Sequence, residues 1–82
     1  MKPASASPGG EMCIMDASGH QQLSWRLGQF DEINAARAAF EYWLTQGYTA
    51  FGALTRTQAK HAIKTFDPAM EEVILVPRIV GG

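Results

Sequence analysis

The sequence is poor in residues that build disulfide or metal frameworks. Cys13 is its single cysteine, so an internal disulfide and a cysteine-based zinc site both lack partners. The two histidines, His20 and His61, fall in different segments, and no carboxylate is spaced to join them on one face. A lone cysteine inside an apolar run favours a small core side chain over a reactive thiol, and it predicts a reducing, cytoplasmic setting. No metal ion and no cofactor are expected.

Excess charge and long apolar runs are also missing. The net charge is −1, and the basic residues are scattered, with Arg56, Lys60 and Lys64 as the only local group. This distribution lacks the basic footprint of a nucleic-acid-binding surface. The longest apolar runs span about four residues, whereas a membrane-spanning helix needs about twenty. The sequence therefore predicts neither a nucleic-acid partner nor a membrane partner.

The motifs of common catalytic sites are absent as well. The sequence contains no GxSxG, GxGxxG, HExxH or phosphate-binding P-loop pattern. Its 82 residues provide one small core, which leaves little room for a deep catalytic pocket. We therefore interpret the chain as non-enzymatic, and as a binding module, a carrier or a modifier.

The chain begins with a segment that predicts little structure. Residues 1–10 are rich in proline, alanine, serine and glycine, which indicates a flexible leader that the fold does not need. A single domain of residues 11–78 follows. Its first part has strand patterns at residues 12–15 and 21–25, joined by a turn that needs a positive φ at Gly19. We expect these two strands to form a hairpin.

A helix of about residues 32–46 is the element with the most support. Asp31 is the expected N-cap, and Gly47 is the expected stop signal. After Gly47, Tyr48 is expected to fold back over Trp43 in a Schellman closure. This pattern predicts the only substantial helix of the domain.

Three further strands are expected at residues 49–54, 61–66 and 73–76, the last being covered on both faces or nearly so. Asp67 and Pro68 predict a turn that joins the last two strands as a hairpin, with Glu71 and Glu72 at its solvated tip. The fold class is therefore α+β, in the order ββαβββ, with one helix packed on a mixed sheet. The expected core residues are Ile33, Phe40, Leu44, Ile63 and Leu75.

The end of the chain combines a strand with a small-residue tail, in the stretch EVILVPRIVGG of residues 72–82. Pro77 has no N–H to donate, so it ends the strand. Gly81 and Gly82 have no side chains, and could enter a channel too narrow for any Cβ. The tail resembles the C-termini of ubiquitin-like modifiers and small sulfur-carrier proteins, which share a β-grasp fold and end in Gly-Gly after a final central strand. The run VPRIVGG also resembles the end of the ubiquitin-like domain in phage tail-tip assembly proteins.

This resemblance implies a reduced β-grasp fold of the bacterial or phage type, with an extended tail at residues 79–82. It implies activation of the Gly82 carboxylate, next to Gly81, by a dedicated adenylating enzyme, with a metal-dependent isopeptidase as a second partner. The residues expected to be recognised in the tail are Arg78, Ile79 and Val80. The chain departs from ubiquitin in its Ile-Val pair before the glycines and in lacking a short helix before the last strand.

Two other interpretations remain open. The chain could be a non-catalytic assembly or interaction module of a phage or mobile element, in which the tail is only the edge of a docking strand. It could also be a β-rich domain whose terminal glycines have no role.

Overall fold

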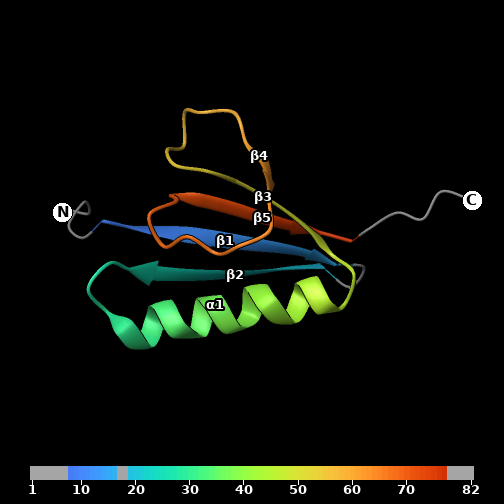
Figure 1. The fold of residues 1–82 in the computed structure, drawn as a ribbon, viewed down its shortest axis with the longest axis horizontal. Coiled ribbons are helices and arrows are strands. Elements are labelled where there is room, and N and C mark those ends of the chain that lie inside the picture. The colour runs from blue at the N-terminus through green and yellow to red at the C-terminus, as the bar shows by residue number, and fades with distance from the viewer. Residues whose placement is uncertain (1–7, 17–18, 78–82) are drawn as a thin grey trace, which may run out of the picture.

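A computed structural model of the chain describes residues 8–16 and 19–77. These residues form one mixed sheet with a single helix packed along one of its faces (Figure 1). The α+β class, the element order ββαβββ and the packing of one helix on a mixed sheet are confirmed. The elements are β1 (Gly9–Asp16), β2 (Gly19–Arg26), α1 (Phe30–Thr45), β3 (Thr49–Ala53), β4 (His61–Ile63) and β5 (Glu72–Val76).

The strands lie in the order β2-β1-β5-β3-β4, so the last strand of the chain is the central one. Strand β5 pairs with β1 in parallel and with β3 in antiparallel orientation. The expected hairpin between the last two strands is wrong, because β3 lies between β4 and β5 and pairs with both. The strongly apolar β5 takes the central position, and β4, with only three residues, lies at one edge.

Helix α1 begins at Phe30, slightly earlier than the sequence predicted, and the assignment of Asp31 as N-cap is wrong. Gln29 occupies the cap position and makes no side-chain cap bond. A tight turn after β2 sets this start, with Gly28 at φ 93° and the Gln29 N–H donating to the Arg26 carbonyl at 3.1 Å. Glu32 in the first helical turn also accepts from the Arg26 backbone N–H at 2.9 Å. The start of the helix is therefore fixed by hydrogen bonds to the end of β2 rather than by an Asp31 side-chain cap.

The C-terminal end of α1 has the Schellman geometry that the sequence predicted. Gly47 has φ 93° and donates to the Leu44 carbonyl at 3.0 Å, and Tyr48 donates to the Trp43 carbonyl at 3.0 Å. The Tyr48 ring lies 4.7 Å from the Trp43 ring, centroid to centroid. This closure turns the chain directly into β3.

The core lies between α1 and one face of the sheet. Alternate residues of β1 and β5 point into it, and the rings of Trp25 and Phe66 meet edge to face at 4.9 Å. Trp25 Nε1–H donates to the Pro68 carbonyl at 2.9 Å, so its polar atom is also satisfied. Of the expected core residues, Ile33, Phe40 and Leu75 are buried, while Leu44 and Ile63 are partly buried at its margin. The buried cluster comprises Met12, Ile14, Trp25, Ile33, Ala36, Phe40, Ala50, Phe66, Met70, Val73 and Leu75.

The domain begins earlier than residue 11. Strand β1 starts at Gly9, and Gly9 and Gly10 pair with Arg26 and Trp25 of β2. Gly10 is buried, and a Cβ at that position would meet the Met70 carbonyl oxygen and the Trp25 ring. The glycines at the end of the expected leader are therefore part of the sheet.

Two apolar runs are covered on one face only. In β1, Met12 and Ile14 are buried, whereas Cys13 is half-buried on the face away from α1, so its assignment to the core is wrong. In β5, Val73 and Leu75 are buried, while Ile74 is half-buried on the same open face. A single helix covers one side of the sheet, which leaves the alternate residues on the other side.

The expected strand of residues 61–66 is shorter than predicted and ends at Ile63. Phe66 then leaves the sheet and turns its ring into the core. The turn that follows is confirmed, because the Met70 N–H donates to the Asp67 carbonyl at 3.0 Å and the Asp67 side chain accepts from the Ala69 N–H at 2.9 Å. Pro68 occupies its second position.

Candidate functional site

The tail residues that the sequence singled out, Arg78, Ile79, Val80, Gly81 and Gly82, lie outside the described residues. The structure shows where that tail is attached. Strand β5 is the central strand, it ends at Val76 opposite Thr49, and the exposed Pro77 follows. The tail is therefore connected to the middle of the sheet rather than to an edge strand.

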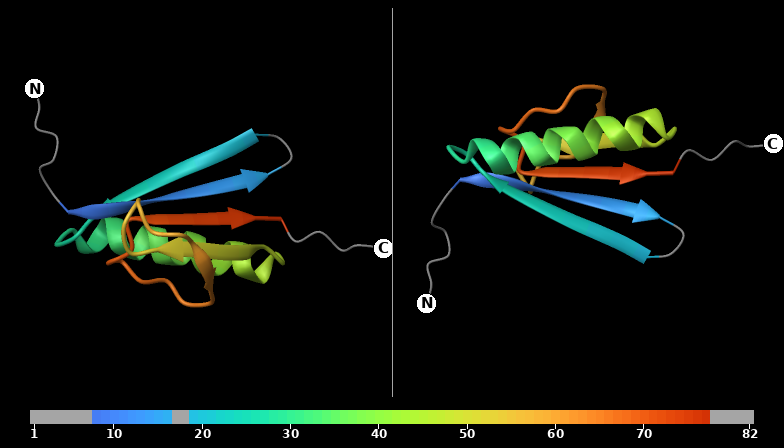
Figure 2. Two further views of the ribbon diagram at one scale, coloured as in Figure 1. Left: turned by 90° about the horizontal axis from the view of Figure 1, so that it is seen from above. Right: turned by 90° about the horizontal axis from the view of Figure 1, so that it is seen from below.

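The face of the sheet away from α1 carries an apolar row. The strand registers place Cys13 beside Ile74, Ile74 beside Phe51, and Phe51 beside Ala62. Cys13, Ile74 and Phe51 are half-buried, because no helix covers this face in the described part of the chain (Figure 2). We call this row, Cys13-Ile74-Phe51-Ala62, the open-face row.

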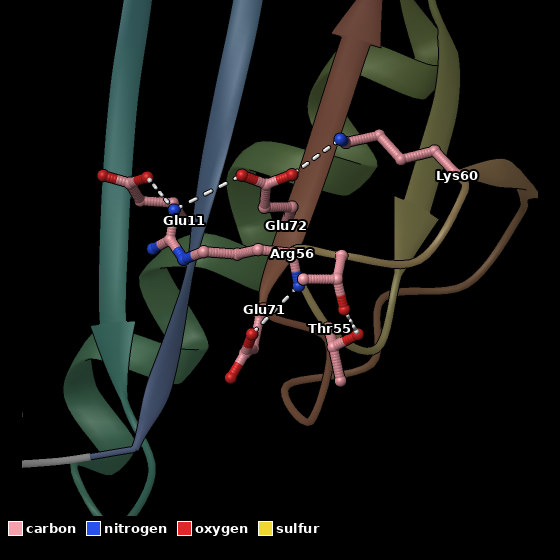
Figure 3. A network of polar contacts seen from close by, with 7 residues as sticks. Glu11, Thr55, Arg56, Lys60, Glu71 and Glu72 are labelled. Atoms are coloured by element: carbon pink, nitrogen blue, oxygen red, sulfur yellow. Dashed lines mark hydrogen bonds and ion pairs between the residues drawn. The ribbon is translucent and has the colours of Figure 1, made fainter.

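A cluster of charged residues borders the open-face row (Figure 3). Lys60 Nζ lies 2.6 Å from Glu72 Oε1, and Arg56 Nη1 lies 3.3 Å from Glu72 Oε2 and 3.5 Å from Glu11 Oε1. The Arg56 backbone N–H donates to Glu71 Oε1 at 3.1 Å. These contacts connect the segment after β3 to the starts of β1 and β5.

The parallel register explains why this cluster needs cations. Glu11 and Glu72 are direct neighbours across β1 and β5, and like charges at such positions repel. Arg56 lies between the two carboxylates and reaches both. The hydrogen bond from Lys60 is the largest cause that holds the pKa of the Glu72 carboxyl below its ordinary value, and the charge of Arg56 acts in the same direction.

Sequence reasoning placed Glu71 and Glu72 at a solvated hairpin tip, and this is wrong because both bind Arg56. Each of Glu11 and Glu72 stands immediately before an apolar strand run. That pattern predicts a pair of adjacent carboxylates only once the two strands are known to be parallel neighbours. The pairing of the first and last strands is not visible locally in the sequence.

The cluster and the open-face row enclose a shallow hollow of about 180 Å³. Cys13 lies in it, and its thiol lies 3.5 Å from the Met15 sulfur. Among residues 8–16 and 19–77, no three His, Cys, Asp or Glu side chains converge to hold a metal ion. His20 and His61 are exposed on strands at opposite edges of the sheet. The arrangement is a surface hollow bordered by ion pairs. The lining residues are Glu11, Cys13, Gln22, Lys60, Glu72, Val73 and Ile74.

No helix in the described part of the chain has the length and apolar character needed to cross a membrane. Comparisons of the chain with protein-family models, with curated proteins and with solved structures find no match.

Proposed function

We propose that this chain is a ubiquitin-like modifier or carrier of the reduced β-grasp type, which acts through the carboxylate of Gly82. One observation carries the proposal. The strand that leads into the diglycine is the central strand of a mixed sheet packed on one helix, as the resemblance to ubiquitin-like proteins implies. Strand β5 is hydrogen-bonded to β1 on one side and to β3 on the other, so the strand before the tail is fixed on both sides.

The chemistry belongs to the tail carboxylate and to the partner enzyme. A Gly82 carboxylate oxygen attacks the α-phosphorus of ATP, pyrophosphate leaves, and an acyl-adenylate forms. An enzyme thiolate, or a sulfide in the carrier variant, then attacks the acyl carbon and displaces AMP. In the modifier variant an amine finally displaces the thiol to give an isopeptide bond. Gly82 must be the terminal residue for this reaction, either as synthesised or after removal of any residues that follow.

The chain itself supplies recognition and access. Gly81 and Gly82 present no side chain to a narrow channel, and Arg78, Ile79 and Val80 are the residues that a groove in the activating enzyme would recognise. The proposed partners are a dedicated adenylating enzyme and a metal-dependent isopeptidase in a cytoplasmic setting. The domain is a non-enzymatic recognition module for these partners, without a nucleic-acid or membrane partner.

Pyrophosphate exchange tests the proposal directly. A candidate adenylating enzyme encoded beside this chain is incubated with ATP, labelled pyrophosphate and one of three chains: the wild type, the chain without Gly81 and Gly82, and Gly81→Val. We expect exchange with the wild type and none with either variant, because valine adds a β-branched side chain where only glycine fits. Intact-mass measurement establishes that the wild-type chain ends at Gly82.

Ala59→Val is the matched control. Ala59 is exposed in the segment after β3, next to Lys60, which binds Glu72 at the start of β5, whereas the tail follows the end of β5, so the substitution adds the same side chain outside the tail. Exchange with this control should equal that of the wild type, and all four chains should have the same melting temperature. Equal exchange by the wild type, the truncation and Gly81→Val would exclude activation at the diglycine.

The open-face row favours a second candidate, the assembly or interaction module. Its half-buried apolar side chains, with Ile74 at the centre, form a surface that a partner could cover. Neighbouring genes separate the two candidates, since an adenylating enzyme and an isopeptidase favour a modifier and tail-assembly genes favour a module. For a module, Ile74→Asp should abolish a complex with the product of an adjoining tail gene. No enzyme should activate the diglycine in that case.

A further inference from the structure

The two edge strands of the sheet differ in how they are protected. Strand β4 has three residues and is flanked by Lys60 and Lys64. Strand β2 has eight residues, pairs one-to-one with β1 along its whole length, and contains no proline, no lysine and no bulge. Short strands, lysines, prolines and bulges are the devices by which natural sheets block pairing at an edge. One edge of this sheet is therefore blocked and the other is open.

Figure 2 shows β2 on the outer side of the sheet, diverging from α1 toward the Gly19 end, with no other described element beyond it. The helix contacts β2 at its Arg26 end, where Glu32 binds the Arg26 guanidinium at 2.7 Å. The rest of the strand has no hydrogen-bonded neighbour on its outer side in the described part of the chain.

The hydrogen bonds of this region show which backbone groups point outward. The Leu27 N–H donates to the Pro8 carbonyl, so odd-numbered residues of β2 face β1. Even-numbered residues therefore direct their N–H and C=O groups away from the sheet. At Arg26 both outward groups are bound already, the N–H by Glu32 and the carbonyl by Gln29. His20, Gln22 and Ser24 remain, and nothing in the described part of the chain pairs with their outward groups.

We propose that two copies of this chain associate through the open edge of β2, in an antiparallel and twofold-symmetric pairing centred on Gln22. In this register Gln22 lies opposite Gln22 of the second copy, and His20 lies opposite Ser24 of the second copy. Each opposed pair exchanges two backbone N–H···O=C bonds. All three residues with free outward groups are thereby paired with one another.

Neighbouring registers are poorer. A shift of one residue places outward groups opposite groups that already face β1, so no bonds form. A symmetric pairing centred on Leu23 places His20 opposite Arg26, whose outward groups are bound by Glu32 and Gln29. The register centred on Gln22 is the one that uses the free groups and avoids the bound ones.

The side chains of β2 are compatible with this register. On the open face, the two Gln22 amides meet each other and the His20 imidazole meets a Ser24 hydroxyl, and both pairs can form hydrogen bonds. On the α1 face, Gly19 lies opposite Trp25 and adds no side chain to the crowded indole. No like charges are opposed along the pairing, and the net charge of −1 per copy gives little long-range repulsion.

The symmetry favours a second copy over the strand of an unrelated protein, because the same three residues supply both sides of the pairing. It also closes the assembly. A β2–β2 pair leaves only the short, lysine-flanked β4 strands at the outer edges of the joined sheet, so the product is a dimer rather than a fibre. This association does not depend on the proposed modifier function.

Hydrogen exchange measured by NMR gives a residue-specific test with the full chain. The amides of His20, Gln22 and Ser24 should exchange rapidly in dilute solution and become protected as the concentration rises over about a hundredfold range. The amides of Gln21 and Leu23 bond to β1, so they should be protected throughout. Sedimentation velocity over the same range should show a monomer–dimer equilibrium.

Substitutions at Gln22 separate pairing from folding. Gln22→Pro removes an N–H that points away from β1, so it leaves the β1–β2 bonds in place but blocks the centre of the pairing. Gln22→Lys keeps the backbone donor and places like charges directly opposite each other, which should weaken dimerisation by about fivefold or more. Gln22→Thr is the matched control, since it keeps both the donor and the strand preference and should dimerise like the wild type.

A wild type that stays monomeric at all concentrations would overturn the proposal. So would a dimer that persists unchanged in Gln22→Pro and Gln22→Lys, because it would use another surface. Concentration-independent exchange at His20, Gln22 and Ser24 would also contradict it. If a protein encoded beside this chain protects these amides while the chain alone stays monomeric, the open edge binds a foreign strand instead of a second copy.

Discussion

Gly10 shows how closely the start of β1 packs against the rest of the molecule. A methyl group at this position would meet the Met70 carbonyl oxygen and the Trp25 ring, and a backbone oxygen cannot rotate aside. We expect Gly10→Ala to lower the free energy of unfolding by about 1–3 kcal/mol. Urea unfolding measures this, and unchanged stability would show that the turn carrying Met70 shifts without cost.

Two phenylalanines of one helix provide a matched test of the core. Phe40 is fully buried between α1 and the sheet, whereas Phe30 is 76% exposed at the start of the same helix. Phe40→Ala should destabilise the fold by about 3–5 kcal/mol. In a domain of this size such a loss can abolish folding.

Phe30→Ala should change the free energy of unfolding by less than about 0.5 kcal/mol, since it removes an exposed side chain. Thermal and urea unfolding of both variants make the comparison. A similar loss for the two variants would show that the helix does not pack as the structure places it.

At the residue scale, the sequence identified apolar runs but not which of their residues face the core. Residues 12–15 and 73–76 are uninterrupted apolar runs, and such runs are typical of strands covered on both faces. The structure buries Met12 and Val73 but leaves Cys13 and Ile74 on the open face. The difference depends on how many helices the chain can place against the sheet, and residues 8–16 and 19–77 contain one.

Lys60 and Arg56 form ion pairs with Glu72 that connect the segment after β3 to β5. These ion pairs make the stability of the fold depend on pH. The pKa of Glu72 is lowered in the folded state, chiefly by the hydrogen bond from Lys60, so the folded chain binds that proton less readily than the unfolded chain. The stabilisation is therefore present above the unfolded pKa, about 4.3, and is lost as the pH falls through the lower folded value.

We expect Glu72→Gln to lower the melting temperature at neutral pH, and the difference from the wild type to vanish in acid. Glu41→Gln is the control, because Glu41 is exposed on α1 and no ion pair to it is found in the described part of the chain. Its melting temperature should follow that of the wild type at every pH. A difference for Glu72→Gln that is independent of pH would show that the charge of this group is not involved.

The start of β1 gives a prediction about the first element. Removing residues 1–10 takes away Gly9 and Gly10, which pair with β2, and the Pro8 carbonyl that accepts from Leu27. We expect a melting temperature lower by about 5–10 °C. Removal of residues 1–7 should leave it unchanged, since their composition offers little apolar area for burial. Equal effects of the two deletions would place the boundary of the fold elsewhere.

At the element scale, the sequence predicts turns and helix ends, which depend on neighbouring residues, but not the pairing of distant strands. The end of α1 at Gly47 and the turn at Asp67 follow from backbone preferences within a few residues, and both were predicted correctly. The position of β3 between β4 and β5 depends on contacts between distant segments. A β-prone run does not reveal its neighbour, so the last two strands were wrongly predicted to pair with each other.

At the scale of the whole molecule, the two proposed functional regions lie at different places in one sheet. The tail continues from β5 at the centre, whereas the open edge belongs to β2, with β1 between them. In a twofold pairing of β2 strands the two sheets run in opposite directions. The two Pro77 residues therefore lie toward opposite ends of the joined sheet.

This separation predicts that activation and dimerisation can be abolished independently. Deletion of Gly81 and Gly82 should abolish pyrophosphate exchange but leave the melting temperature and the dimerisation constant unchanged, because the tail follows β5 in the sequence and β1 separates β5 from β2. Gln22→Pro should abolish the dimer and leave exchange at the wild-type rate, because Gln22 lies on the edge strand β2 and β1 separates that strand from β5. Sedimentation velocity and exchange assays on the same preparations measure both properties. If Gln22→Pro also lost exchange while remaining folded, the activating enzyme would have to recognise the dimer or the β2 edge itself, and the two regions would not be independent.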